Sequence, residues 1–195
     1  MKILFVSSEC APFSKSGGLA DVAFSLPPAL QKTGDELTIV IPMYRVTQEN
    51  YGDQFSLIKT CVIHLGQRQL SCALYKGELN GVTVYAIGNE HLFHRPRLYG
   101  YGDDSLRFAF FCRAVIDLLP EFGDLPDILH CNDWETALAI LYLKNDAVLN
   151  DALSHIKTVY TIHNIAYQGQ FGRSEMETTF ALPDGWYHGG LSYEF

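Results

Sequence analysis

Short apolar runs alternate with amphipathic stretches along most of this chain. Four runs have the length and composition typical of buried parallel strands: residues 2–7, 36–42, 127–133 and 156–164. Three stretches between them carry the apolar spacing of helices: residues 18–34, 104–122 and 134–145. This alternation predicts an α/β fold, a Rossmann-like doubly wound parallel sheet.

A middle segment departs from that pattern. Apolar and polar residues alternate with a period of two at residues 57–65, 69–77 and 82–88, as in strands with one exposed face. Asn80-Gly81 separates the last two runs and is a strong two-residue turn signal. We therefore expect an antiparallel hairpin insertion at one edge of the parallel sheet.

Local signals predict where several elements end. Pro27 and Pro28 should kink or interrupt the first helix, and Gly34 should end it. Residues 44–51 are polar and predict a loop, and Asp103 or Asp104 is a candidate N-cap for the helix that follows. Residues 170–195 are loop-like, and we expect them to be partly mobile. No linker divides the chain, so one domain over residues 1–195 is predicted.

Composition narrows the class of protein. A hydrophobic content of 48% in 195 residues is typical of a folded globular domain, and no apolar run approaches the ~18 residues that span a bilayer. The net charge of -8, without a basic tract, argues against a nucleic-acid surface. The odd number of cysteines, without a CxxC, indicates reduced thiols and a cytoplasmic protein: Cys10, Cys61, Cys72, Cys112 and Cys131.

Polar residues gather after three of the expected strands. Ligands of parallel α/β sheets bind beyond the carboxyl ends of the strands, so these residues are candidates for a site. The first strand leads into Glu9, Lys15, Gly17, Gly18 and Asp21. The strand that ends near residue 131 leads into Asn132, Asp133 and Trp134, and the next one into His163, Asn164 and Tyr167.

The glycine pair suits an anion. Gly17 and Gly18 expose backbone N–H groups, the next helix offers its positive end, and Lys15 adds a full charge. Neither a P-loop nor a G-x-G-x-x-G fingerprint is present, however. The alternative is a glycine turn that only tightens the corner between strand and helix, with Lys15 in solvent.

The other two clusters also have two readings. Asp133 is a natural helix N-cap, while His163 and Asn164 offer the hydrogen-bonding groups that sugar hydroxyls require. A metal site is not expected, because neither His91 with His94 nor His130 with Asp133 forms a helical i, i+4 pair. The G-x-S-x-G signature of many hydrolases is absent.

Together these motifs resemble the bacterial glycogen synthases and plant starch synthases. The resemblance spans nearly the whole chain and rests on "LFVSSECAPFSK", "KSGGLADV", "RPRLYG" with "DDSLRFAFF", "HCNDW" and "TIHNIAYQG". Two residues depart from the family pattern: Asp104 stands where Asn is usual, and Glu135 where Gln or His is usual.

The resemblance implies a two-domain GT-B glycosyltransferase. Residues 1–195 would be its N-terminal, acceptor-side Rossmann-like domain, and the C-terminal nucleotide-binding domain would be missing from this chain. The family transfers glucose from ADP-glucose, or UDP-glucose in some members, to the non-reducing 4-hydroxyl of an α-1,4-glucan or maltooligosaccharide, with retention. Neither a metal nor another cofactor is implied, and neither nucleic acid nor a membrane is expected as a partner. A bacterial, cytoplasmic location is expected.

The family also implies roles for individual residues. Asp133 and His163 would be catalytic, Asn164 would hold glucose hydroxyls, and Asp21 would lie near the nucleotide end of the donor. Lys15, Gly17 and Gly18 would meet the donor phosphates, while Glu9 and Tyr99 would lie on the acceptor side. Two alternatives remain: a non-catalytic glucan-binding α/β module, and another nucleotide-sugar enzyme such as an epimerase.

Overall fold

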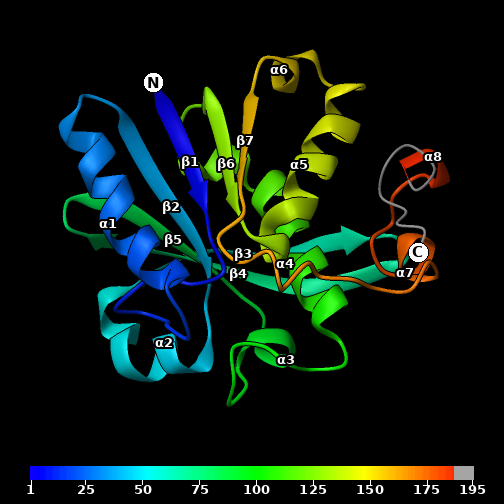
Figure 1. The fold of residues 1–195 in the computed structure, drawn as a ribbon, viewed down its shortest axis with the longest axis horizontal. Coiled ribbons are helices and arrows are strands. Elements are labelled where there is room, and N and C mark those ends of the chain that lie inside the picture. The colour runs from blue at the N-terminus through cyan, green and yellow to red at the C-terminus, as the bar shows by residue number, and fades with distance from the viewer. Residues whose placement is uncertain (187–195) are drawn as a thin grey trace.

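A single seven-stranded sheet forms the centre of the molecule (Figure 1). The computed structural model describes residues 1–186. The strands lie in the order β3-β4-β5-β2-β1-β6-β7. Their bounds are β1 Lys2–Val6, β2 Glu36–Pro42, β3 Ser56–Leu65, β4 Arg68–Leu79, β5 Val82–Gly88, β6 Ile128–Asn132 and β7 Lys157–Thr161.

Helices connect the strands and cover both faces of the sheet. The α-helices are α1 Leu19–Lys32, α2 Arg45–Tyr51, α3 Glu90–Phe93, α4 Asp104–Asp117, α5 Trp134–Ala147, α6 Asp151–Ser154, α7 Glu175–Thr178 and α8 Asp184–Trp186. Two 3-10 turns, Gly52–Gln54 and Leu119–Phe122, follow α2 and α4. Within the described part of the chain, no helix has both the length and the apolar character needed to cross a membrane.

Five neighbouring strands are parallel: β5, β2, β1, β6 and β7. Beside them, β4 pairs antiparallel with both β5 and β3. The expected hairpin turn is confirmed, because Asn80 and Gly81 have φ values of 52° and 81° between β4 and β5. The insertion differs in one respect from the prediction. Strand β5 pairs parallel with β2 and belongs to the central sheet, so only β3 and β4 extend the edge.

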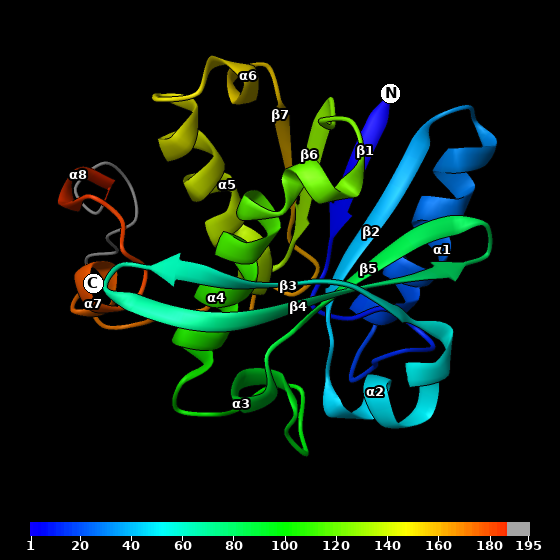
Figure 2. The same cartoon turned by 180° about the vertical axis from the view of Figure 1, so that it is seen from behind.

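Alternating side chains of the central strands enter two separate cores. Ile3 and Phe5 of β1 pack with Ala23 of α1 on one face. Leu4 and Val6 point to the other face, into the core that α4 and α5 cover. Figure 2 shows the two helix layers on opposite sides of the sheet. The doubly wound α/β fold predicted from the alternating pattern is therefore confirmed.

Helix α1 runs through both prolines instead of breaking at them. A proline inside a helix removes a hydrogen bond and costs about 3 kcal/mol or more. The helix nevertheless continues to Lys32, because its buried face, which includes Leu19, Ala23 and Pro27, packs against the sheet. The expected interruption is wrong, whereas Gly34, with φ of 103°, does end the helix as predicted.

Residues 45–51 form a helix where a loop was expected. The segment is too short and too polar to show a helical apolar period. Tertiary contacts hold it instead: the buried Thr47 hydroxyl donates to the Phe13 carbonyl at 3.1 Å, and the Tyr51 ring packs edge-on against Phe13 at 5.5 Å. This contact ties α2 to the loop after β1, which carries the candidate glycine motif.

Residues 170–186 are anchored to the body of the molecule. Met176, Phe180 and Leu182 join the core beneath α5, and the Tyr142 hydroxyl donates to the Phe180 carbonyl at 2.8 Å. Residues 187–195, the remainder of the segment expected to be partly mobile, lie outside the described residues.

Candidate active site at the carboxyl edge of the sheet

Strands β1, β6 and β7 are neighbours and end at the same edge (Figure 1). In the sheet register Val6 lies beside Cys131, and Asn132 lies beside Thr161. Each of the three clusters singled out in the sequence begins directly after one of these strands. The topology therefore places all three clusters at one edge, as the sequence predicts.

Asp133 joins the ends of β6 and β7. Its Oδ1 accepts hydrogen bonds from the backbone N–H groups of His163, at 2.7 Å, and Asn164, at 3.4 Å. Its own N–H donates to the Thr161 carbonyl at 2.9 Å. The side chain makes no bond to the first turn of α5. The alternative reading of Asp133 as a side-chain N-cap is therefore wrong, because the carboxylate is used between strands instead.

Asn132 fixes the imidazole of His163. Its Nδ2 donates to the Val6 carbonyl at 3.0 Å, and its Oδ1 lies 2.9 Å from His163 Nε2. Because the amide oxygen can only accept, Nε2 must carry the hydrogen in this contact. In a neutral ring Nδ1 is then an acceptor, which suits a substrate hydroxyl. His163 and Asn164 are both exposed at this edge.

Glu9 organises the loop after β1. The carboxylate is only 3% exposed and accepts from the Ser16 backbone N–H and hydroxyl and from the Gly17 N–H, at 3.2 Å for the last. The Tyr99 hydroxyl donates to Glu9 Oε1 at 2.8 Å and lies 2.9 Å from Ser8 Oγ. Glu9, Gly17 and Tyr99 are thus brought together. The Gly17 N–H, expected to face an anion, points to Glu9.

The glycines at 17 and 18 are not required by the backbone or by packing. Gly18 has φ of −71° and ψ of −21°, which any residue adopts. A Cβ atom added at either position would meet nothing within 4 Å. The simple corner-turn alternative therefore lacks support, since the fold itself tolerates a larger residue. The two glycines leave open space above their Cα atoms.

Lys15 lies at the surface beside Asp21. Its Nζ is 2.5 Å from Asp21 Oδ1, and the two side chains are 51% and 60% exposed. Exposed pairs of this kind contribute about 0–1 kcal/mol, so the ammonium group is easily redirected to another anion.

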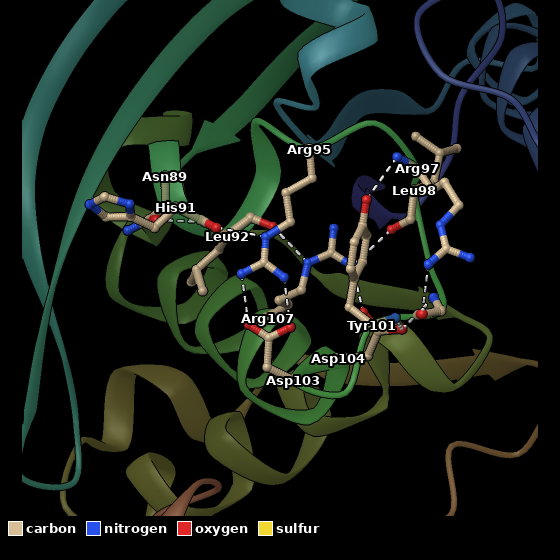
Figure 3. A network of polar contacts seen from close by, with 11 residues as sticks. Asn89, His91, Leu92, Arg95, Arg97, Leu98, Tyr101, Asp103, Asp104 and Arg107 are labelled. Atoms are coloured by element: carbon tan, nitrogen blue, oxygen red, sulfur yellow. Dashed lines mark hydrogen bonds and ion pairs between the residues drawn. The ribbon is translucent and has the colours of Figure 1, made fainter.

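A network of arginines holds the loop that carries Tyr99 (Figure 3). Arg95 binds Asp103 through both guanidinium nitrogens, at 2.6 and 2.7 Å, and holds the pKa of this carboxyl below its usual value. Arg107, with 0% exposure, pairs with Asp104 at 2.5 Å and donates to the Leu98 carbonyl at 2.9 Å.

Asp104 closes this network on its other side. Its Oδ2 accepts from the N–H groups of Gly100, at 2.7 Å, and Tyr101, at 3.2 Å. Asp103 occupies the N-cap position of α4, as predicted, but its side chain makes no capping hydrogen bond. Both carboxylates are occupied by arginines that fix the loop from 94 to 103, and hence the position of Tyr99.

Two hollows flank the glycine loop and the edge. One, of about 570 Å³, is lined by Phe13, Lys15, Ser16, Tyr51, Arg97 and Tyr99, among others. The other, of about 440 Å³, is lined by residues that include Tyr101, Asp104, Trp134, Tyr167, Gln168 and Phe171. In the second, Gly169 is sterically required: its φ is 61°, and a Cβ atom would lie 2.4 Å from the Trp134 ring. Aromatic faces beside amides are typical of carbohydrate sites.

A buried carboxyl lies just behind this edge. Burial raises the pKa of Glu135 to about 8, and the nearby carboxylates of Asp133 and Glu9 add to the rise. Its Oε2 has no hydrogen-bond partner among the described residues, and with this raised pKa the group holds a proton at neutral pH. Burial likewise lowers the pKa of His130, whose Nε2 lies 2.8 Å from Thr161 Oγ1. Among residues 1–186, no group of three or more His, Cys, Asp or Glu side chains is arranged to hold a metal ion.

Sequence reasoning assigned no role to Asn132, which it placed among the candidates, and it missed Ser16 and Arg107. Asn132 orients His163, Ser16 completes the shell around Glu9, and Arg107 supports the Tyr99 loop. Asn132 carried a usable signal, because it directly precedes Asp133 at a strand end. Ser16 and Arg107 did not, since their roles depend on loop conformations that bring Ser16 to Glu9 and Arg107 to Leu98.

The fold and this edge define a Rossmann-like half of a GT-B glycosyltransferase. The chain superimposes on the catalytic domain of Starch Synthase IV from Arabidopsis thaliana bound to ADP and acarbose, with a TM-score of 0.82 and 30% identity. The match covers 94% of this chain and 38% of that one.

The family follows from the sequence comparisons. Residues 2–194 match the family described as starch synthase catalytic domain. The chain is 44% identical over 188 residues to the glycogen synthase of Bacillus cereus (strain Q1), and 42% identical over 191 residues to that of Ligilactobacillus salivarius (strain UCC118). These alignments cover 96% and 97% of this chain, which spans 40% of each relative's length. The chain therefore belongs to the starch synthase catalytic domain family, which confirms the resemblance.

The backbone at Asp133 generates a first prediction. Its φ of 57° and ψ of 175° are strained for any residue except glycine, at about 1–3 kcal/mol. Asp133→Ala and Asp133→Gly both lose the bonds to His163 and Asn164, but only glycine relaxes the strain. In urea unfolding we expect the alanine variant to be less stable than the glycine variant by about 1 kcal/mol. An alanine variant more stable than the glycine variant would show that this backbone carries no strain, because glycine is otherwise the less stable of the two by about 0.5–1 kcal/mol.

The protonated Glu135 generates a second prediction. An unfolded chain releases this proton near pH 4.5, and the folded chain near pH 8. Between these values the folded state holds the extra proton, so this group lowers the free energy of unfolding as pH rises, by up to about 1.4 kcal/mol per unit. Glu135→Gln keeps the shape and cannot ionise.

The stability gain of Glu135→Gln over the parent should therefore grow from pH 5 to pH 8, as measured by urea unfolding at several pH values. Parallel curves for the two proteins would contradict a raised pKa at this position.

Proposed function

We propose that this chain forms the acceptor-side half of a retaining glucosyltransferase. The full enzyme transfers glucose from ADP-glucose to the non-reducing 4-hydroxyl of an α-1,4-glucan. The observation that carries the proposal is the edge where the Asp133 carboxylate binds the N–H groups of His163 and Asn164 beside the glycine loop. The names of the relatives, glycogen synthases, and the ADP and acarbose bound to the Arabidopsis neighbour support the same activity.

His163 and Asn164 are assigned to the glucose hydroxyls of the donor. The Asn132 contact leaves His163 Nδ1 as an acceptor, and Asn164 lies exposed next to it. Asp133 lies between them with a negative charge on Oδ1. We assign it to the transfer point, where it orients these groups and stabilises positive charge that develops on the sugar.

Lys15 and the glycine pair are assigned to the leaving diphosphate. A departing diphosphate needs cationic and dipolar groups that are already in place. Within residues 1–186, Lys15 is held by an exposed pair with Asp21, and the space above Gly17 and Gly18 admits a phosphate close to the backbone. Asp21 then lies near the nucleotide end of the donor. No metal ion or other cofactor enters this proposal.

Tyr99 and Glu9 are assigned to the acceptor side. Their mutual hydrogen bond places the Tyr99 ring at the margin of the 570 Å³ hollow, beside Tyr51 and Arg97. A glucan chain or maltooligosaccharide laid along this hollow would meet aromatic faces on its apolar side. The nucleotide base is assigned to a second domain outside this chain.

A non-catalytic glucan-binding module is the second candidate. The aromatic hollows described above are sufficient for glucan binding without transfer.

Removal of the Lys15 charge tests the donor assignment. In a protein of the relatives' full length that carries this chain, Lys15→Ala should lower kcat about 100-fold with ADP-glucose, because the leaving-group charge loses its cation. Lys32→Ala, in the last turn of α1 and so at the end of that helix away from the glycine loop, is the matched control and should leave kcat unchanged. Near-normal turnover of Lys15→Ala, with the fold intact, would refute the phosphate role.

The isolated chain separates transfer from binding. Incubated with ADP-glucose and a maltooligosaccharide, it should bind the maltooligosaccharide in calorimetry but release no ADP, because half of the donor site is missing. The full-length protein should release ADP under the same conditions. A full-length protein that binds glucan and never releases ADP would favour the non-catalytic module instead.

A further inference from the structure

Two cysteines lie directly opposite each other in the β3–β4 pair, away from the carboxyl edge. The register pairs Cys61 of β3 with Cys72 of β4. Directly opposite residues of antiparallel strands point to the same face, and their Cα atoms lie about 4.5 or 5.5 Å apart. Disulfides need Cα separations of about 4.4–6.8 Å, so either kind of pair satisfies this requirement without movement of the backbone.

The two thiols contact each other but differ in exposure. Burial raises the pKa of Cys72 strongly, and a hydrogen bond with the Cys61 thiol adds to the rise. Cys72 is 3% exposed in the core of an internal strand. Cys61 is half-buried on β3, which is the edge strand of the sheet (Figure 2). A small reagent can therefore reach Cys61 and not Cys72.

We propose that Cys61 and Cys72 form a cross-strand dithiol that closes to a disulfide on reaction with a low-molecular-weight disulfide. The Cys61 thiolate attacks one sulfur of the reagent, forms a mixed disulfide and releases one thiolate. Cys72 loses its proton to solvent, attacks the sulfur of Cys61 and displaces the second thiolate. The two protein thiols are oxidised by two electrons, and the reagent disulfide is reduced to two thiols.

The surroundings of Cys61 favour it as the entering group. Lys59 lies two residues earlier on the same face of β3, where its Nζ donates to Glu121 Oε1 at 2.6 Å. This hydrogen bond is the main cause of the raised pKa of Lys59, and the charge of a Cys61 thiolate adds a smaller contribution. The Lys59 ammonium group is therefore close enough to stabilise that thiolate during attack. Burial strongly raises the pKa of Cys72, so this thiol reacts second. Its position next to Cys61 makes the second step intramolecular, which compensates for its low reactivity.

The remaining cysteines serve as internal comparisons. Cys10, Cys112 and Cys131 are each 0% exposed. Burial raises the pKa of Cys10 and of Cys131 to about 12, so both resist attack on a disulfide. Cys112 on α4 and Cys131 on β6 influence each other's environment and form the rival pair.

Peptide mapping tests the proposal on the chain itself. The folded chain is incubated with oxidised glutathione, free thiols are alkylated, and the protein is digested with trypsin without reduction. Cleavage after Arg68 separates the two cysteines, so a disulfide must join peptide 60–68 to peptide 69–76. We expect this cross-linked pair in most of the protein, and its disappearance after treatment with dithiothreitol.

Three variants, and a search for a disulfide between Cys112 and Cys131, make the test more specific. Cys10→Ser should form the same cross-link, Cys72→Ser should leave glutathione on Cys61, and Cys61→Ser should leave Cys72 unmodified. Circular dichroism checks that each variant is folded. If a variant is not folded, the cross-link in the parent protein decides the outcome. Retention of five alkylatable thiols in the oxidised parent, or a link between peptides 108–113 and 114–144, would overturn the proposal.

Discussion

The candidate site depends on one carboxylate that ties two parallel strands together where they end. Asp133 Oδ1 accepts the N–H groups of His163 and Asn164, which follow β7, while Asp133 itself follows β6. A parallel sheet brings strand ends to one edge but does not fix the loops beyond them. The ionic hydrogen bonds at Asp133 supply that order, and they require the strained backbone that turns its side chain away from α5.

The loop that carries Tyr99 is ordered by a different kind of interaction. Arg107 places a full positive charge at 0% exposure, and its Nη2 has no hydrogen-bond partner in the described part of the chain. A buried charge is costly unless it is paired. Asp104 provides the pairing, and three rings, those of Phe93, Tyr101 and Phe108, lie 4.9–5.5 Å from the guanidinium carbon. A neutral Asn at 104 would leave Arg107 without this compensating charge.

Local signals in the sequence predicted the elements well, and long-range contacts account for what they missed. The apolar runs gave all four central strands outside the hairpin segment, and Asn80-Gly81 gave its turn. Helix α2 was missed because the contacts of Thr47 and Tyr51 with Phe13, not an apolar period, stabilise it. The continuity of α1 was missed because packing outweighed the prolines.

The candidate site was also predicted in part by local signals and in part not. That three polar clusters share one edge follows from the order of strands, which alternating patterns predict. The sequence could not predict that the Asp133 carboxylate binds the residues after β7 and not the first turn of α5. An Asp at this position suits either role. The hydrogen bond between Glu9 and Tyr99 likewise could not be predicted, because it joins residues 90 positions apart.

The environment of Glu9 also decides what the glycine loop can offer to a ligand. Its buried carboxylate holds the Gly17 N–H, and breaking that bond would leave a buried charge partly unsatisfied. The exposed Lys15–Asp21 pair, in contrast, opens at little cost. A diphosphate at this loop would therefore meet the Lys15 ammonium group and the start of α1, and the contribution of Gly17 would be its missing side chain. The Lys15 ammonium group that would bind the diphosphate can move, whereas the backbone of the glycine loop is held in place by Glu9.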